Sequence, residues 1–571
     1  MAGGLLNLVA IGNANIFLTG TPEKTFFKVA YSKYTNFGLQ KFRIDYNGTR
    51  DLRLTESSTF TFKIPRYAEL LMDTYLVVTL PDIWSPIYPP KRHDSEQKVV
   101  GSPGVWSTYD FKWIEDLGTH MIRDIEVVAG SYILAKYSGD YLAAMVDRDF
   151  TEEKKKLFNQ MSGNTIDLHN PEAAFDRFNT YPNAYFQEQG AVGSSTYPPT
   201  NSTEGIEPSI RGKNLYIPLN SWFTLNSKCA YPLIASQYQE LEIRITLRPI
   251  QELFRVRDVW DQENNYPYIQ PDFNQERFHM YRFLQSPTRL NILDPAAYPN
   301  RFNTWNADIH LLSTYAFLSK DEAALFAKED QVYLVKDVFT YRFDNIYGSK
   351  KIKMDSKGMV SSWMWYLQRN DVNMRNEWSN YTNWPYRKLP SNVKLGPVNV
   401  LTNNAYADSI TSSSNVSSNT GIFTSGNFCM DNQKEIMNSM GILLDGKYRE
   451  TTLPREVFDY VEKYTRTNGF AKEGLYCYNF CLDTNPTTYQ PSGAMNLGTF
   501  QHVELELTTF MPRIDEDNSN FDVICSEDGA PIAVTKSNWR LYEYTYNLVL
   551  FEERYNVISF MGGNAGMLYA R

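Results

Sequence analysis

Apolar side chains recur at every second position in several separate stretches of this chain, and this period constrains the fold more than any other feature. The stretch ELEIRITL (240–247) alternates aliphatic residues with charged or hydroxyl residues, and STFTFKIP (58–65) and VELELTTF (503–510) show the same alternation. Successive side chains of a strand point to opposite faces of the sheet. A period of two therefore predicts strands that bury one face and expose the other.

Further strand patterns, separated by turn residues, occur along the whole chain. They lie at YLVVTL (75–80), IRDIEVVAG (122–130), QVYLVKDVFTYRF (331–343) and YEYTYNLVLF (542–551). Many short strands with turn-rich connections are typical of antiparallel sandwiches or barrels. The sequence thus predicts an all-β protein.

Three short segments carry helix signals. Ser319 and Glu322 form a capping-box pattern before DEAALFAKED, and Thr151 is placed to cap EEKKKLFNQM. Pro454 opens REVFDYVEKYTR, which Gly469 follows. We expect all three helices to be excursions between strands.

Composition limits the possible functions. The length of 571 residues exceeds the size at which one hydrophobic core stops growing, so we expect two domains. The net charge of −9, without a basic block, argues against direct binding of nucleic acid. Five scattered cysteines do not form a disulfide framework, which favours a reducing compartment. Neither a signal-peptide pattern nor a long apolar run is evident.

The chain divides near Pro249, where a strand-rich first half gives way to a stretch rich in Asn, Pro and aromatic residues. We predict a glycine-interrupted apolar arm over residues 1–27, a first domain over 28–252 and a second domain over 253–571. Residues from about 370 to 430 are rich in Ser, Thr, Asn and Gly and are predicted to form a long exposed loop. Its stem would be held by Trp378, Trp384 and Tyr386.

The segment YQPSGAMNLGTF (489–500) lies between two strand patterns and has the chemistry of a turn. Pro491 cannot donate to a sheet, and Gly493 tolerates a positive φ. Cys477 and Cys481, just before it, are interpreted as buried free thiols on one strand face.

Several blocks, taken in order, resemble the major capsid proteins of nucleocytoplasmic large DNA viruses. They are GGLLNLVAIGNANIFLTGTPEKTFFKVAYSKYTNF (3–37), FKIPRYAELLMDTYLVVTLP (62–81), WIEDLGTHMIRDIEVVAGSYILAKYSGDYL (113–142), YIPLNSWFTLNSKCAYPLIASQYQELEIRI (216–245) and NFCLDTNPTTYQPSGAMNLGTFQHVELEL (479–507). Their shared order makes the resemblance more specific than any single motif. One departure is that Leu497, Gly498 and Thr499 follow Asn496, where the family often has Ser-Arg.

The resemblance implies two tandem eight-stranded antiparallel jelly rolls with short helical excursions and long loops. It implies a structural protein that forms pseudo-hexagonal homotrimers in the icosahedral capsid of a large DNA virus, assembled in the host cytoplasm. The expected partners are further copies of the chain, minor capsid proteins and penton proteins, with no direct nucleic-acid contact. The resemblance also places the N-terminal arm toward the inner side of the shell, in proximity to an inner membrane.

A search for catalytic constellations finds no recognisable set. The six histidines are scattered without zinc spacing, and no P-loop, GxGxxG or GxSxG motif is present. We therefore predict no catalytic, cofactor-binding or metal-binding residues. Glycosylation sequons occur at Asn47, Asn201, Asn380 and Asn415, and an unmodified asparagine is the favoured interpretation of each. Asn415 is the best candidate for a glycan, because the Ser-, Thr- and Asn-rich residues around it indicate an exposed loop.

Three functions from different classes remain open. A structural shell protein is the leading one. A lectin-like tandem β-sandwich that binds carbohydrate is the alternative, since jelly rolls also serve as lectins. A carbohydrate-active enzyme is the third, because the two acids of a glycosidase can lie far apart in sequence.

Overall fold

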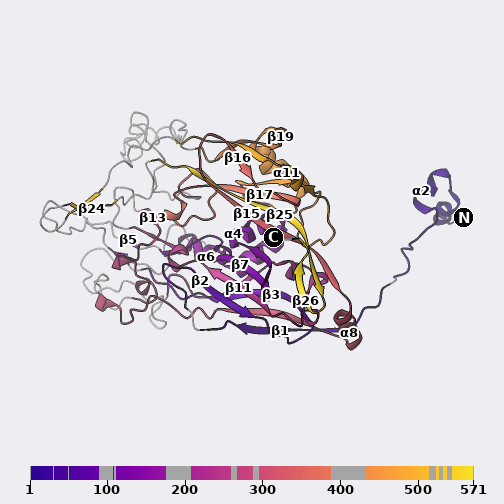
Figure 1. The fold of residues 1–571 in the computed structure, drawn as a ribbon, viewed down its shortest axis with the longest axis horizontal. Helices are drawn as coiled ribbons and strands as arrows, with labels where there is room; N and C mark the ends of the chain where they lie inside the picture. The colour runs from indigo at the N-terminus through magenta and orange to yellow at the C-terminus, as the bar shows by residue number, and fades with distance from the viewer. Residues whose placement is uncertain are drawn as a thin grey trace.

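The protein is built mainly of antiparallel β-sheets that form two sandwiches, one above the other in Figure 1. The computed structural model describes residues 2–29, 31–48, 51–85, 87–88, 107–108, 111–174, 208–258, 267–286, 295–387, 433–512, 522–525, 531–535 and 543–569. The fold is the double jelly roll expected from the resemblance, with few and short helices.

The first sandwich consists of two sheets whose inner faces carry the alternating apolar residues. One sheet has the order β1-β14-β3-β10, with β9 also paired to β3, and the other has the order β2-β11-β7-β8. The strands are β1 (Phe37–Asp45), β14 (His310–Leu318), β3 (Leu70–Thr79), β10 (Tyr231–Pro232), β9 (Asn214–Pro218), β2 (Ser58–Lys63), β11 (Leu241–Leu247), β7 (Ile122–Ala129) and β8 (Tyr132–Tyr137). Along β11, buried and half-buried residues alternate without exception, which confirms the predicted period.

Strand β14 lies far along the chain but belongs to the first sandwich. It pairs with all nine residues of β1 and also with β3. The predicted domain boundary at residue 253 would assign it to the second domain. Alternation reveals that a strand exists but not which sheet it joins, so the pairing favours a boundary after Leu318.

The second sandwich repeats the arrangement of two facing sheets. One sheet has the order β15-β25-β17-β20, with β21 on β17 and β26 on β25, and the other has the order β16-β22-β18-β19. The strands are β15 (Gln331–Ile346), β25 (Tyr546–Met561), β17 (Met359–Arg369), β20 (Leu475–Asn479), β21 (Met495–Asn496), β26 (Asn564–Met567), β16 (Ser349–Met354), β22 (Val503–Thr509), β18 (Met437–Leu444) and β19 (Lys447–Pro454). The alternation predicted for Val503–Thr509 is confirmed.

Smaller sheets and helices occupy the connections. The sheets are β13-β12-β6, β4-β5 and β23-β24, made of β13 (Tyr268–Ile269), β12 (Phe254–Arg257), β6 (Phe111–Trp113), β4 (Ile87–Tyr88), β5 (Ser107–Thr108), β23 (Asp522–Cys525) and β24 (Pro531–Thr535). The α-helices are α1 (Gly3–Val9), α2 (Ile16–Thr19), α3 (Leu117–Met121), α4 (Gly139–Asp149), α5 (Glu152–Ser162), α6 (Ile166–His169), α7 (Trp222–Leu225), α8 (Lys320–Lys328) and α11 (Glu462–Arg466).

The three predicted helices all exist, with differences in detail. Ser319 caps α8 by accepting a hydrogen bond from the Glu322 amide at 3.4 Å, as predicted. Thr151 precedes α5, but its side chain makes no capping hydrogen bond, so that expectation is wrong. Pro454 ends β19, and the helical segment that follows contains a π-helical turn over Val457–Val461 before α11.

The sheet that contains β17 and β25 is covered on both faces. Trp363 and Trp365 pack in the core of the second sandwich, whereas Met364 and Tyr366 pack in a cluster that extends through the first sandwich. This continuous burial explains why WMWYL lacks the alternation of a half-exposed strand. The two sandwiches therefore share one hydrophobic cluster across their contact.

The N-terminal residues have no such cover. Between residues 2 and 36, every described residue except the half-buried Asn15 is exposed. Figure 1 shows this segment extending away from the body of the molecule, starting near β1 and α8. Among the residues that the structure describes, no helix is long and apolar enough to span a membrane.

The start of the predicted exposed loop is packed rather than solvated. Most residues from 370 to 387 are buried or half-buried, so the prediction of exposure is wrong for this part. Trp378 donates its indole hydrogen to the Glu252 carbonyl at 2.9 Å, and Tyr386 donates to the Tyr268 carbonyl at 2.7 Å. These two aromatic residues hold the stem as predicted. Residues 388–432 lie outside the described part of the chain.

Candidate functional site: the seam between the sandwiches

The two sandwiches meet along a contact, here called the seam, between α4 and its neighbours in the first sandwich and β15, β17 and β25 in the second. Arg148, near the end of α4, lies fully buried in it. Its guanidinium donates to Asp149 at 2.9 and 2.6 Å and to Glu553 on β25 at 2.8 Å. A further hydrogen bond of 3.2 Å reaches Ser362 on β17. One arginine thus joins a helix of the first sandwich to two strands of the second.

Glu553 is held as a carboxylate by its surroundings. Burial alone would raise its pKa, but the positive charges of Arg148 and Lys336 outweigh burial and hold the pKa of Glu553 below its usual range. Ser362 and Tyr141 add hydrogen bonds of 2.8 and 2.9 Å to its two oxygens. Every strong donor around the carboxylate comes from residues fixed in secondary structure, so the charge serves to position those elements.

A second buried cluster lies further along the seam. Asp116, just before α3, accepts hydrogen bonds from Ser379 at 2.6 Å and from Lys472 at 2.9 Å. Burial opposes its ionisation, but the charges of Lys472 and His120 hold the pKa of Asp116 far below its usual range. Ser379 and Lys472 come from the second half of the chain, so this carboxylate also ties the two sandwiches together.

His120 connects this carboxylate to a third. Its Nδ1 lies 2.9 Å from Asp140 and its Nε2 lies 2.9 Å from the Ser379 hydroxyl. Ser379 gives its single hydrogen to Asp116, so Nε2 of His120 must donate to it. Asp140 also accepts from Arg248 at 3.1 Å, which marks it as ionised. These contacts link Asp116, Ser379, His120 and Asp140 into one continuous chain of hydrogen bonds.

The loop from Asp483 to Gly493, which ends with the Gln-Pro-Ser-Gly segment, forms a strap across the seam. The Ser492 hydroxyl donates to the Asp483 carbonyl at 2.8 Å and closes the loop at its base. Lys336 donates to the Thr484 carbonyl at 3.0 Å, and Asn226 of the first sandwich donates to the Thr487 carbonyl at 2.9 Å. Gly493 has a φ of 135°, which confirms the predicted turn chemistry. The loop thus helps to fasten the two sandwiches, and Ser492 of the motif closes it at its base.

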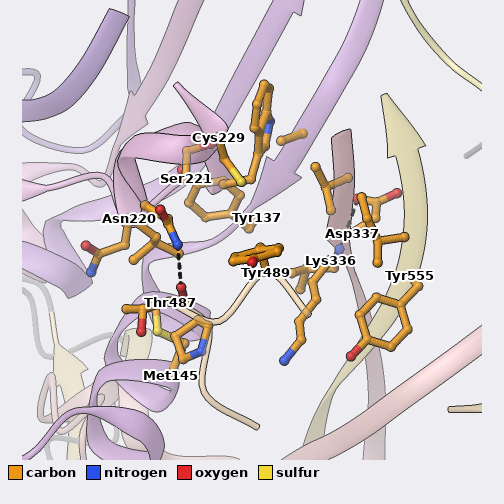
Figure 2. Close-up of a pocket in the computed structure, with 18 of the residues that line it drawn as sticks. Tyr137, Met145, Asn220, Ser221, Cys229, Lys336, Asp337, Thr487, Tyr489 and Tyr555 are labelled. Atoms are coloured by element: carbon orange, nitrogen blue, oxygen red, sulfur yellow. Dashed lines mark hydrogen bonds between the residues drawn. The ribbon is translucent and has the colours of Figure 1, made fainter. Parts of the chain in front are cut away.

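A cavity of about 80 Å³ lies beneath the strap, between the two sandwiches. Figure 2 shows Tyr489 lying between Tyr137 of the first sandwich and Lys336 of the second. Asp337 is the one carboxylate among the lining residues that the structure describes. Glycoside hydrolysis needs a pair of carboxyl groups flanking the bond, so this lining does not fit it. Within the described ranges, no group of His, Cys, Asp or Glu side chains could hold a metal ion.

Comparisons with known proteins agree with this architecture. A family model described as "Major capsid protein N-terminus" matches residues 25–285, and one described as "Large eukaryotic DNA virus major capsid protein" matches residues 322–566. The chain belongs to the major capsid proteins of large DNA viruses. Proteins of this family are shell components, so the role of the chain is structural.

Individual relatives cover the whole length at low identity. The major capsid protein of Phaeocystis pouchetii virus is 23% identical, and that of Paramecium bursaria Chlorella virus 1 is 24% identical, each with 100% of both chains covered. The major capsid protein of Chrysochromulina ericina virus is 28% identical over 64% of this chain, which corresponds to 58% of that relative.

Solved structures support the fold. A chain of the PBCV-1 virus capsid has a TM-score of 0.57 at 16% identity, with 96% of this chain and 100% of that chain covered. The faustovirus major capsid protein has a TM-score of 0.55 at 10% identity, with 96% and 94% covered.

The sequons of this capsid protein differ in accessibility. Asn47 is exposed just after β1. Asn380 is buried, its amide nitrogen donates to the Trp384 carbonyl at 2.8 Å, and its oxygen accepts from Thr382 at 2.6 Å. A glycan on Asn380 would require these bonds to break, so the folded structure disfavours it. Asn201 and Asn415 lie outside the described residues.

Among the five cysteines, the three whose side chains the structure describes are free thiols. They are Cys229, Cys477 and Cys481. Cys477 and Cys481 are buried, and burial raises the pKa of Cys477 to about 12. Cys229 is half-buried at the cavity. The interpretation of Cys477 and Cys481 as buried free thiols is confirmed, but their expected place on one strand face is wrong, because β20 ends at Asn479 and Cys481 lies beyond it.

Sequence reasoning missed the charged residues of the seam. Arg148 and Asp149 end a helix whose eleven residues are all buried, and Glu552, Glu553 and Arg554 interrupt an apolar strand that is covered on both faces. Charged residues in the middle of a strand as apolar as NLVLFEERY are unusual unless they are paired. These charged residues within an apolar strand could have indicated a buried ion pair, but the sequence does not identify the residue that pairs with Glu553.

Proposed function

We propose that the chain forms a homotrimer with a pseudo-hexagonal outline, which acts as the capsomer of an icosahedral virion capsid. The observation that carries this proposal is the repetition of one two-sheet architecture within a chain whose halves are locked by a buried seam. Three copies around a threefold axis present six similar sandwiches at roughly sixfold positions. Further copies of the chain are therefore the main partner, and minor capsid and penton proteins would complete the shell after assembly in the host cytoplasm.

Mass photometry of the purified full-length protein tests the trimer, and negative-stain electron microscopy tests its outline. We expect a species of three times 66.0 kDa with a hexagonal face-on projection. A monomer at micromolar concentration, with no larger species, would refute the proposal.

The chain is proposed to act without catalysis. The carboxylates of the seam are buried or half-buried and accept hydrogen bonds from fixed side chains, which suits them to fixing geometry rather than to transferring protons. A panel of glycosidase substrates should show no turnover above the level of a Glu553→Gln preparation. A rate that the substitution abolishes would contradict this interpretation.

The N-terminal arm, residues 1–27, is proposed to act in assembly on the inner side of the shell. All of its described residues except the half-buried Asn15 are exposed, which supports this role, because its deletion removes no described buried residue. We expect the deleted protein to retain its circular dichroism spectrum and its trimer but to lose ordered lattice formation. Loss of the folded spectrum would show that the arm is part of the core.

A further inference from the structure

The N-terminal arm and the nine residues that follow it carry a large apolar surface that no described part of the molecule covers. Thirteen large apolar side chains in residues 1–36 are between 48% and 98% exposed. They are Leu5, Leu6, Leu8, Val9, Ile11, Ile16, Phe17, Leu18, Phe26, Phe27, Val29, Tyr31 and Tyr34. Soluble proteins rarely leave apolar surface of this extent open unless it marks an interaction site. The arm therefore requires a partner.

The distribution of charge along the arm indicates the chemistry of that partner. Residues 1–22 contain no Asp, Glu, Lys, Arg or His, and residues 23–36 contain three lysines against one glutamate. Residues 1–36 thus carry +2, and residues 37–571 carry −11 of the total of −9. Lys24, Lys28 and Lys33 are interspersed with four exposed aromatic side chains. An uncharged apolar end followed by lysines and aromatic residues matches the layers of a lipid surface.

We propose that the N-terminal arm binds directly to the surface of an anionic lipid bilayer. The apolar residues of α1 and α2 would enter the boundary between headgroups and acyl chains, and the aromatic residues would lie at headgroup level. The lysines would remain in water and attract anionic headgroups, since long cationic side chains bury their stems and expose their charges. The proposal rests on the inward position of the arm proposed above and adds the identity of what it meets there.

The geometry allows this contact without rearrangement of the body. The described residues between 20 and 36 belong to no helix or strand, and Figure 1 shows this stretch running away from β1 toward the terminal helical turns. An extended segment of this length spans up to about 60 Å. A flexible reach of this size would let the arm meet a bilayer while the acidic body stays outside the range of charge repulsion, which is about 8 Å at physiological salt.

Flotation of the full-length protein with vesicles tests the proposal. We expect flotation with vesicles of phosphatidylcholine and phosphatidylserine, weaker flotation with phosphatidylcholine alone, and none for the arm-deleted protein, which here lacks residues 1–36. Replacement of Lys24, Lys28 and Lys33 by Gln should lower the partition coefficient about 100-fold, or about fivefold for each lysine. A Phe26→Ser, Phe27→Ser variant should also bind more weakly.

A matched control separates specific from general charge effects. Lys350, Lys351 and Lys353 on β16 are exposed and lie in the body, so their replacement by Gln should leave flotation unchanged. Equal loss in this control, equal binding to neutral and anionic vesicles, or flotation of the arm-deleted protein would each overturn the proposal.

Mass photometry of the same samples distinguishes this proposal from the trimer proposal. If the wild-type protein forms trimers but does not float, the bilayer is not the partner of the arm. If, in addition, the arm-deleted protein no longer forms trimers, the arm instead docks on another copy of the chain. If the protein floats but remains monomeric, the capsomer proposal fails while the lipid contact stands.

Discussion

Replacement of Arg148 by Met should strongly destabilise the protein, because this arginine neutralises two buried carboxylates at once. Its side chain lies within 2.9 Å of Asp149 and Glu553, and all three are buried. After the replacement, Lys336, at 3.6 Å, would be the remaining cation near Glu553 among the described residues. Removal of one partner from a buried ion pair costs about 3–5 kcal/mol, since the remaining charge is left uncompensated. We expect a loss in that range.

The free energy of unfolding can be compared from urea midpoints followed by tryptophan fluorescence. Arg43→Met is the matched control, because Arg43 also contacts two carboxylates, Asp45 and Asp308, but is half exposed and should cost less than about 1 kcal/mol. Adding Glu553→Gln to Arg148→Met should recover part of the loss, about 1–3 kcal/mol, because the two residues interact directly. If Arg148→Met matched the Arg43 control, the seam would not be the stabilising contact described above.

Three further outcomes follow from individual residues. The lowered pKa of Glu553 stabilises the fold at pH values above the ordinary glutamate pKa of about 4.3, and this contribution is lost as the pH falls. In the Glu553→Gln variant, the urea midpoint should therefore decrease less steeply with pH below about pH 4. Gly493→Ala should cost about 1–3 kcal/mol, because φ is 135° and a Cβ would lie 3.2 Å from the Phe480 carbonyl oxygen; a thermal melt measures this loss. Leu505→Ala removes a fully buried side chain of β22 and should cost about 2–5 kcal/mol in the same assay.

The strand periods predicted the interiors of the sandwiches well. At β11 and β22, one face is buried and the other reaches solvent, so the local sequence carries the whole signal. The cap at Ser319 and the turn at Gly493 were also predictable, because each depends on a few consecutive residues. The jelly-roll topology was predicted from the family resemblance, which rests on the order of the matching sequence blocks, and not from the strand period.

Contacts between distant segments could not be predicted in the same way. The pairing of β14 with β1 joins residues more than 260 positions apart, and the contact of Arg148 with Glu553 joins residues 405 apart. Residues 370–387 illustrate the opposite error, since a polar composition suggested a loop in water. Their polar groups are instead satisfied inside the protein, as when Asp371 binds both Arg369 and Arg375.

The charges of the seam suggest how one chain maintains a fixed angle between two sandwiches. Apolar contacts are non-directional, so two faces joined by them alone could slide by small amounts at little cost. Hydrogen-bonded charges such as Arg148 and Glu553 are satisfied in one register only, and any displacement leaves a buried charge unpaired. In a shell, every copy of the chain would add its own deviation in the angle between the sandwiches. A capsid protein therefore benefits from contacts that fix this angle. We therefore expect the Arg148→Met, Glu553→Gln variant to fold but to give trimers with a wider spread of angles between sandwiches in cryo-electron microscopy. A spread equal to that of the wild type would show that apolar packing alone sets the angle.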